Sequence, residues 1–373
     1  MKKILIITKG FFPILSPRSL RATELAIEFS KQGHEVTVLT HRIEQVHANF
    51  EKDFGVKILN FVGKEWKEVI NFENNSIKWH QRFIRRALLM FFDYPLIQYV
   101  FLVKHSIKKL NLFNSYDSLI TIAVPHSIHW SISLLSKHTR RRISKVWIAD
   151  CGDPYMYALH DTFRKFFYFH FFEWNFLRKA DYITVPFDEM KLLFYMRFRH
   201  KFKVIPQGVQ FKEWKLAQYV TNSCPTFAYS GLIMKGKRDP FELLDCLIEK
   251  NIDFKFIFYT TQNYLFDGYK SLLDSKIELR NYVPRETLFF ELSKMDFLVN
   301  VDTASDAGVR NAIPSKLIDY HFTKRPILSY EHGKLSKELV DEFMSADYKR
   351  AFNDPDIERF DISKVAASFL ALD

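Results

Sequence analysis

The chain has few cysteines and no long uninterrupted apolar run, and each shortage excludes a class of protein. Three cysteines are spread over 373 residues, which is too few for a disulfide framework or a cysteine metal cluster and favours a reducing compartment. The longest apolar run, residues 87–103, is interrupted by Asp93 and Pro95 and falls short of the roughly 20 apolar residues of a membrane-spanning helix. We therefore expect a cytoplasmic protein without a transmembrane segment.

Motifs that bind nucleic acid are also missing from the sequence: there is no zinc-finger spacing, no RNP-like aromatic motif and no long Lys/Arg run. The formal charge is nevertheless +11, and residues 1–200 hold 30 Lys and Arg against 18 Asp and Glu, whereas residues 201–373 hold 24 against 25. A basic half is typical of proteins that bind nucleic acid, an anionic membrane surface or an anionic substrate. Because the motifs are missing, we expect no nucleic-acid partner.

Short apolar runs such as KILIIT, EVTVLT, TFAYSG and DFLVNV alternate with longer helical patterns along the whole chain. Strands that are apolar on both faces predict an α/β fold of parallel sheets covered on both sides by helices. The length favours two domains, and we place them at residues 1–205 and 206–358, divided at the segment IPQGV. Two Rossmann-like, doubly wound domains that face each other predict a binding site in the cleft between them.

The stretch IPSKLIDY, residues 313–320, has the features of a helix start that binds an anion. Pro314 fixes an extended approach and Ser315 can cap the helix, so the first N–H groups point outward at the positive end of the helix dipole. Asp319 lies on the same face as Ser315 and Lys316, about 5 Å further along the axis. A diphosphate at the helix start and a ribose at Asp319 would fit these distances. An ordinary capped helix with a solvated aspartate is the alternative.

Several segments follow one another in a characteristic order: FFPILSPRSLRATELAIEFSKQGHEVTVLT, AVPHSIHWSISLL, KVWIADCGDPYM, KADYITVPFDEM, VIPQGV, YSGLIMKGKRDPFELLDCL and PSKLIDYHFTKRPIL. In this order and spacing the chain resembles the retaining GT-B glycosyltransferases of the family 4 type, which use nucleotide-sugar donors. The resemblance covers almost the whole chain. It implies an acceptor-binding first domain, a donor-binding second domain, a C-terminal helix at about 360–373 that packs back on the first domain, and no metal or other cofactor.

The resemblance also implies donor-side roles for residues of the second domain. Asp319 stands where the family has the glutamate that holds the donor ribose, and Asn311 stands where it has the glutamate that contacts the transferred sugar. Arg238, in a loop with Lys235 and Lys237, is expected to neutralise the departing diphosphate, although a solvated basic loop is the alternative. The other donor-side residues are Gly231, the base contacts Val283 and Arg285, and the helix start Pro314, Ser315, Lys316 and Leu317.

On the acceptor side, Asp150 and Asp153 flank the end of a predicted strand, where a carboxylate could position or deprotonate a hydroxyl. Capping of the next turn is the alternative, and Gly152 stands where a subgroup of the family has arginine. Arg18 and Arg21 are expected either to approach donor phosphates or to be solvated at a helix start. His126 is a further candidate on the acceptor side, although His126 and His129 are expected to pack or to cap the following helix. The catalytic candidates are Asp153, Arg238 and Asn311.

Two stretches, residues 79–109 and 163–179, combine aromatic and basic residues in the way an interfacial helix does. Buried helices explain them equally well, but the basic first half favours a peripheral contact with an anionic inner membrane through Arg82, Arg85 and Arg86.

The sequence thus predicts a transferase that moves a sugar with retention from a nucleoside diphosphate sugar to a glycan or lipid-linked acceptor, in polysaccharide or glycolipid synthesis. A nucleotide-sugar epimerase and a non-catalytic subunit of a glycan assembly complex are the alternatives.

Overall fold

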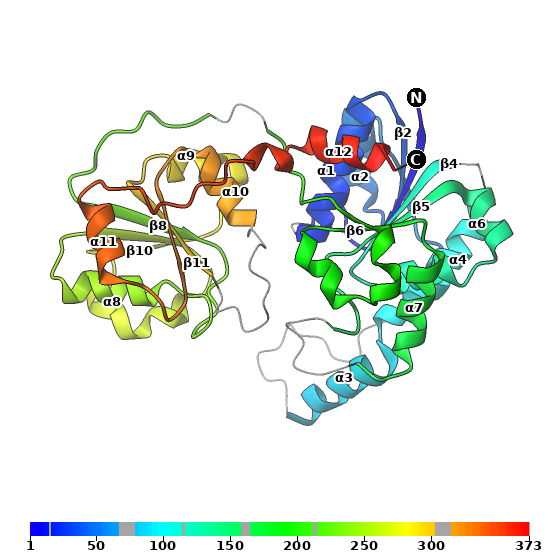
Figure 1. Ribbon diagram of the computed structural model, residues 1–373, viewed down its shortest axis with the longest axis horizontal. Coiled ribbons are helices and arrows are strands. Elements are labelled where there is room, and N and C mark those ends of the chain that lie inside the picture. The colour runs from blue at the N-terminus through cyan, green and yellow to red at the C-terminus, as the bar shows by residue number, and fades with distance from the viewer. Residues whose placement is uncertain are drawn as a thin grey trace. The chain divides into compact units, whose positions relative to one another are not determined.

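The computed structural model describes residues 1–14, 16–66, 79–113, 116–157, 165–211, 215–302 and 315–372 (Figure 1). The chain divides into two compact units, Met1–Phe211 with Glu358–Asp373, and Lys212–Ile357. Each unit contains one parallel sheet with helices on both faces. The predicted α/β fold with two doubly wound sheets is therefore confirmed.

The sheet of the first unit has seven parallel strands in the order β3-β2-β1-β4-β5-β6-β7. Neighbours pair in simple register, for example Ile4 with Val36 on one side and with Ser118 on the other. Its strands are β1 (Lys3–Thr8), β2 (Glu35–Thr40), β3 (Lys57–Asn60), β4 (Tyr116–Ile122), β5 (Ser144–Asp150), β6 (Tyr182–Val185) and β7 (Phe202–Val204).

Alternate side chains of β1 define the two faces of this sheet. Ile4 and Ile6 pack with α1 (Pro17–Lys31), α2 (Glu44–Phe54) and the C-terminal α12 (Ile362–Leu370). Leu5 and Ile7 pack on the opposite face, because successive side chains of a strand point to opposite sides. That face is covered by α4 (Tyr99–Lys109), α5 (Ser127–Ser133) and α7 (Phe169–Lys179).

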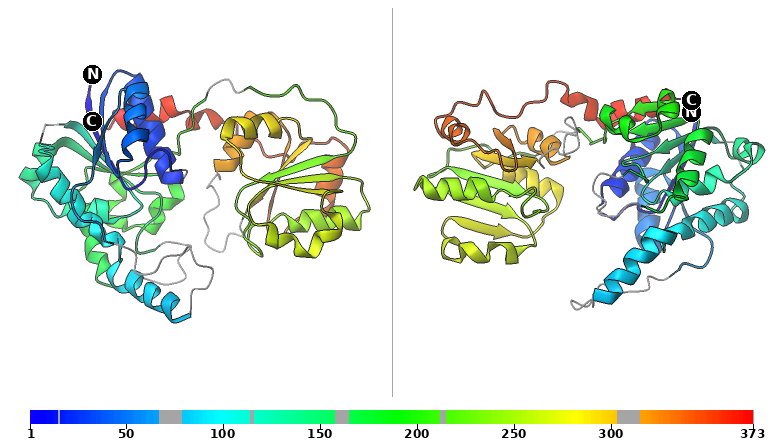
Figure 2. Two further views of the ribbon diagram at one scale, coloured as in Figure 1. Left: turned by 180° about the vertical axis from the view of Figure 1, so that it is seen from behind. Right: turned by 60° about the horizontal axis from the view of Figure 1, so that its bottom comes forward.

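The remaining helices of the first unit are short or lie at its edges. They are α3 (Trp79–Phe92), α6 (Lys137–Ile143) and the 3-10 helices η1 (Leu96–Gln98), η2 (Asp188–Leu193) and η3 (Met196–Lys201). Figure 2 shows α3 extending away from the sheet of its unit.

Contrary to the expectation from the sequence, one described stretch, Phe83–Lys109, is long and apolar enough to cross a membrane by length and composition. It is not one continuous α-helix, because α3 ends at Phe92 and α4 begins only at Tyr99. Asp93 and Pro95, which the sequence analysis identified as interruptions, lie in this break.

The second unit has a five-stranded parallel sheet in the order β10-β9-β8-β11-β12. Its strands are β8 (Thr226–Ser230), β9 (Lys255–Tyr259), β10 (Ile277–Arg280), β11 (Phe297–Asp302) and β12 (Ile327–Glu331). Helices α8 (Phe241–Glu249) and α11 (Lys337–Met344) cover one face, and α9 (Arg285–Leu292) and α10 (Ser315–Phe322) cover the other. The 3-10 helix η4 (Asn263–Leu272) also belongs to this unit, whereas η5 (Ile357–Phe360) begins at its last residue and continues in the first unit.

The strand order of the second sheet reverses at β8, which lies between β9 and β11. In an open parallel sheet, a ligand binds beyond the carboxyl ends of the strands at such a switch point. A ligand of the second unit is therefore expected at the ends of β8 and β11, near α10.

Candidate functional site

The loop after β8 and the start of α10 meet at the switch point of the second unit. Gly231 directly follows β8 and has a φ of 128°, a conformation that glycine adopts more readily than other residues. The buried hydroxyl of Tyr320, on α10, accepts a hydrogen bond of 2.8 Å from the backbone N–H of Ser230. The end of β8 is therefore fixed against α10, and the loop that leads to Arg238 begins from a defined position.

Lys316, near the start of α10, is the most unusual side chain of this site. Its Nζ lies 4.4 Å from the ring centroid of Tyr229, and within the described part of the chain this buried atom has no hydrogen-bond acceptor. Burial and, to a lesser extent, the positive charge of Arg238 lower the pKa of Lys316 to about 7, against the opposing charge of Asp302. A buried ammonium that lacks an acceptor is costly, so Lys316 has the properties expected of an anion ligand.

Arg238 places a second cation near Lys316. Its loop is held by hydrogen bonds from the N–H of Arg238 to the carbonyl of Met234, at 2.8 Å, and from the N–H of Gly236 to Asp239 Oδ2, at 2.5 Å. The buried Nε of Arg238 also has no acceptor among the described residues, whereas Lys235 and Lys237 in the same loop are exposed. Two cations at a helix N-terminus form a site suited to a diphosphate.

Asp319 and Arg285, to which the sequence analysis gave separate roles, form an ion pair in the structure. Burial raises the pKa of Asp319, and the charge of Arg285 opposes this shift. Val283 is partly buried against the core beneath α9 and α10. Asp319 is therefore held in place by a partner, and a ribose would share its carboxylate with Arg285.

Some predicted donor-side positions lie outside the described residues. These are Asn311, Pro314 and the side chain of Ser315, so the sugar contact and the helix cap stay predictions. The side chain of Leu317 is only 2% exposed and packs in the core. Only the backbone of Leu317 is therefore available to a donor, and its place in the donor site stays a prediction.

In the first unit, Asp150 at the end of β5 is enclosed by donors. It accepts hydrogen bonds from Arg21 at 2.7 and 2.8 Å, from Thr184 at 2.6 Å and from Arg18 at 3.2 Å. Burial raises the pKa of Asp150, but the charges of Arg21 and Arg18 outweigh it and hold the pKa below its ordinary value. A buried carboxylate with this many donors is a structural anchor, which corrects its assignment as an acceptor base.

Arg21 also differs from both sequence-based expectations, since it neither reaches a phosphate nor is solvated. Its guanidinium is 2% exposed and donates to the carbonyls of Ile205 and Pro206, at 3.0 and 2.6 Å, as well as to Asp150. It therefore ties α1 to β5 and to the segment after β7. The sequence did not reveal this role because Asp150 lies 129 positions away.

Arg18 occupies the space beside Gly152. A Cβ added to Gly152 would lie 1.5 Å from Arg18 Nη2, so no larger residue fits at 152 while Arg18 keeps this position. The side chain of Arg18 is 20% exposed, and Asp153 beside it is exposed. The structure thus brings together Arg18, Asp150 and Asp153.

Behind this group lies a buried cluster that the sequence analysis missed. The ligating atoms of His126, His129 and Cys151 lie within 4.8 Å of one another, although no metal-ligand spacing was apparent in the sequence. His129 Nδ1 is 2.8 Å from Thr121 Oγ1, and its Nε2 is 3.5 Å from Cys151 Sγ. Burial lowers the pKa of His129 to about 3 and that of His126 well below its ordinary value, so both rings are neutral.

These residue types can bind zinc or another soft metal ion, but both ring nitrogens of His129 already have partners in the cluster. Both histidines are buried in the core, which is one of the roles expected for them, and among the described residues His126 Nδ1 has no hydrogen-bond partner. The spacing His-Ser-Ile-His together with a cysteine at the next strand end was the available signal. The prediction that the protein needs no metal stays a prediction.

Comparisons with known proteins identify the fold. No family model and no curated protein matches the sequence. Three of the similar solved structures, each 13% identical, are sucrose-phosphate synthase from Thermosynechococcus elongatus, a lipopolysaccharide outer core galactosyltransferase, WaaB, and a glycosyltransferase from Rickettsia africae. In the same order, their TM-scores are 0.62, 0.61 and 0.58. The three alignments cover 100, 99 and 99% of this chain, and 98, 98 and 93% of the chain of the similar structure. The chain has the GT-B fold that these glycosyltransferases share.

Proposed function

We propose that this protein is a glycosyltransferase that moves a sugar from a nucleoside diphosphate sugar to a hydroxyl acceptor. The observation that carries the proposal is the pair of half-buried cations formed by Lys316 at the start of α10 and Arg238 in the loop after β8, since the described residues offer Lys316 Nζ and Arg238 Nε no acceptor. The similar structures support it: two of those compared above are named as a glycosyltransferase and a galactosyltransferase, and a further one, S. aureus TarM, was solved with UDP.

The chemistry follows from these charges. When the bond between the sugar and the diphosphate breaks, negative charge develops on the departing phosphate oxygen. Lys316 and Arg238 stabilise this charge at a helix N-terminus that already favours anions, which is electrostatic catalysis without a strong base or nucleophile. Asp319, held by Arg285, orients the donor by accepting hydrogen bonds from the ribose. Asn311 is proposed to contact the transferred sugar, and the reaction is proposed to retain the anomeric configuration without a metal cofactor.

The acceptor side is proposed to lie in the first unit, at the end of β5. Asp153 is the exposed carboxylate there, and Arg18 is partly exposed beside it, so these two residues rather than Asp150 and Arg21 are available to an acceptor. The acceptor is proposed to be a glycan or a lipid-linked glycan of a cell-surface polysaccharide or glycolipid, made on the cytoplasmic side of the membrane.

The test is turnover of a donor in the absence of acceptor. Glycosyltransferases hydrolyse their own donor slowly, so the protein is incubated with UDP-, GDP- and other nucleotide sugars, and the released nucleoside diphosphate is measured. We expect one donor to be cleaved, and we expect Arg238→Ala to reduce cleavage by about tenfold or more. Lys235→Ala is the matched control, because Lys235 is an exposed cation of the same loop.

Three results would contradict the proposal. Equal loss in Arg238→Ala and Lys235→Ala would remove the site from the reaction. Binding of a nucleotide sugar without any cleavage or transfer would instead favour the non-catalytic subunit, and conversion of a donor to its epimer would favour the epimerase.

A further inference from the structure

Helix α3 is an apolar helix that the described structure does not bury. Within the 14 residues WHQRFIRRALLMFF, every side chain whose exposure is described is exposed or half-buried. Phe83 is 67% exposed and Phe92 is 61% exposed. A buried core helix would show the opposite, because large aromatic residues of soluble proteins are usually covered.

The start of α7 continues this apolar surface. The N–H of Phe166 donates to the carbonyl of Met90 at 3.3 Å, and the rings of Phe91 and Phe166 lie 4.9 Å apart, so the end of α3 is attached to the segment before α7. In that segment and in α7, Phe167 is 72% exposed and Phe171 is 61% exposed. We call the exposed residues together the α3 surface: Phe83, Ile84, Arg85, Arg86, Phe92, Phe167 and Phe171.

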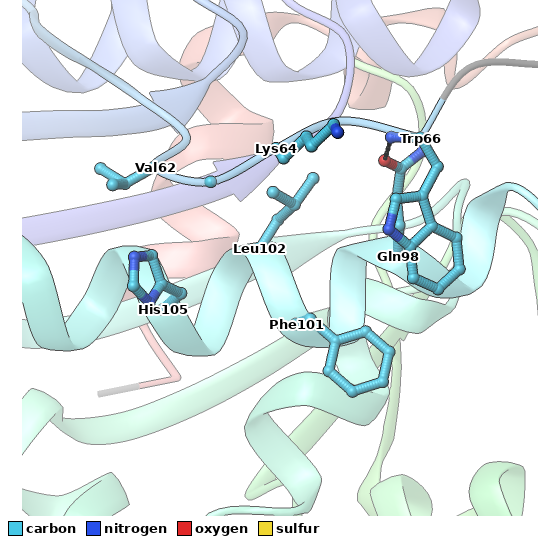
Figure 3. A pocket seen from close by; sticks show the side chains of 8 residues that line it. Val62, Lys64, Trp66, Gln98, Phe101, Leu102 and His105 are labelled. Carbon is cyan, nitrogen blue, oxygen red and sulfur yellow. Dashed lines mark hydrogen bonds between the residues drawn. The ribbon is translucent and has the colours of Figure 1, made fainter.

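A hollow lies at the other side of the break that ends α3 (Figure 3). Trp66 stacks on Tyr94 with ring centroids 5.7 Å apart, and its backbone N–H donates to Gln98 Oε1 at 2.7 Å. Trp66 and the exposed Phe101 form one wall of a pocket of about 360 Å³ that Leu102 and His105 also line. This hollow provides room for an apolar group next to the end of α3.

The charges of the two described segments that form the α3 surface are mostly positive. Residues 79–112 contain six Lys and Arg and a single acid, Asp93, and residues 165–179 contain three Lys and Arg and a single acid, Glu173. Both acids are 0% exposed, and Asp93 is 3.6 Å from Lys165. Arg85 and Arg86 are exposed on α3 itself. Exposed aromatic residues interleaved with cations, with no exposed acid within residues 79–112 and 165–179, match the interface of a bilayer that contains anionic lipid.

We propose that the α3 surface docks the protein on an anionic lipid bilayer, with the aromatic side chains at the level of the headgroups and Arg85 and Arg86 on the lipid phosphates. The donor chemistry proposed above does not enter this argument. A second copy of the chain is the other occupant to test, but two identical surfaces rich in arginine would repel each other in a symmetric pair.

The test is sedimentation of the intact protein with vesicles of phosphatidylcholine alone or mixed with phosphatidylglycerol. We expect binding to rise with the anionic lipid and to fall at high salt, since screening weakens contacts with the surface. Arg85→Glu/Arg86→Glu is expected to reduce the vesicle partition coefficient by about tenfold or more. Phe83→Ser/Phe92→Ser is also expected to reduce it, and because both side chains are exposed the fold should survive, which circular dichroism checks.

The matched control is Lys31→Glu/Lys52→Glu, which makes the same change in charge at two exposed lysines of α1 and α2, on the opposite face of the sheet. It should bind vesicles nearly as well as the unmodified protein. No binding to anionic vesicles at low salt, or equal losses in the two charge-reversal variants, would overturn the proposal. A dimer in solution that Phe83→Ser/Phe92→Ser dissociates would assign the surface to a second copy instead. Donor turnover measured on the same variants keeps this result separate from the proposed reaction.

Discussion

At the scale of single residues, Lys316 and Arg238 are the side chains that indicate the candidate binding site. Each has a buried nitrogen without an acceptor in the described structure, and such groups destabilise a folded protein unless a ligand supplies the missing partner. Lys316 and Asp319 could be identified from the sequence because the spacing in IPSKLIDY is local. The burial that lowers the pKa of Lys316 could not, since it depends on Tyr229, Arg238 and the rest of the fold.

The lowered pKa of Lys316 predicts a pH dependence of anion binding. In the free protein Lys316 loses its proton as the pH rises through about 7, so the affinity for a nucleoside diphosphate should fall across that range. Lys316→Arg should bind with little change between pH 6 and 8, roughly, because arginine stays charged. Titration calorimetry at several pH values tests this, and an unmodified protein whose affinity is constant over the same range would contradict it.

The same shift has a consequence for stability. Because the folded pKa is lower than the unfolded value of 10.5, the unfolded state binds more protons between about pH 7 and 10.5, and stability should rise with pH across that window. The free-energy cost of burying the charged ammonium of Lys316 is fully present below pH 7. Lys316→Met should therefore raise the free energy of unfolding at pH 6 by about 1 kcal/mol, while it weakens donor binding. Denaturant unfolding at pH 6 checks this prediction, and a Lys316→Met variant less stable than the unmodified protein would refute it.

Asp319 offers a prediction that separates ribose binding from the pairing with Arg285. Asp319→Ala should weaken nucleotide binding by about 1.5 to 3 kcal/mol, because the ribose hydroxyls lose a charged acceptor. Arg285→Ala frees the carboxylate and should have a smaller effect. If the two variants weaken binding equally in calorimetry, and the double variant is no worse, then Asp319 acts through Arg285 and the ribose assignment fails.

At the scale of elements, the predicted strands KILIIT, EVTVLT, TFAYSG and DFLVNV overlap β1, β2, β8 and β11 almost completely. This agreement has a physical cause, since parallel strands buried on both faces are continuous apolar runs. Helix α3 could not be assigned in the same way, because a buried helix and an interfacial helix have the same aromatic composition. Only the exposure of Phe83 and Phe92 in the structure distinguishes them.

The ion pair between Arg21 and Asp150, which joins α1 to β5, gives a prediction for the stability of the first unit. Arg21→Ala removes donors from a carboxylate that is 1% exposed and releases α1 from β5 and from the segment at Ile205 and Pro206. We expect a loss of about 3 to 5 kcal/mol in the free energy of unfolding. Arg18→Ala, at the same carboxylate but with one contact of 3.2 Å, should cost much less. Equal losses in urea unfolding would show that Arg21 is not the main anchor.

At the scale of the whole molecule, the chain consists of two units, each with its own parallel sheet and its own core. The amino-acid sequence predicted both sheets because their apolar strands and turn residues are local signals. It did not predict the cluster of His126, His129 and Cys151 or the place of Arg18 beside Gly152, because each depends on residues that only the folded sheet brings together.

The central claim is that the buried cations at the start of α10 hold the diphosphate of a nucleotide sugar. Calorimetric titration of the intact protein with UDP, GDP and ADP, compared with Lys316→Ala and with the exposed-loop control Lys235→Ala, tests it most directly. The account predicts that at least one nucleoside diphosphate binds, that Lys316→Ala weakens this binding by about tenfold or more below pH 7, and that Lys235→Ala leaves it nearly unchanged. No binding of any nucleoside diphosphate, or the same affinity in Lys316→Ala as in the unmodified protein, would contradict it.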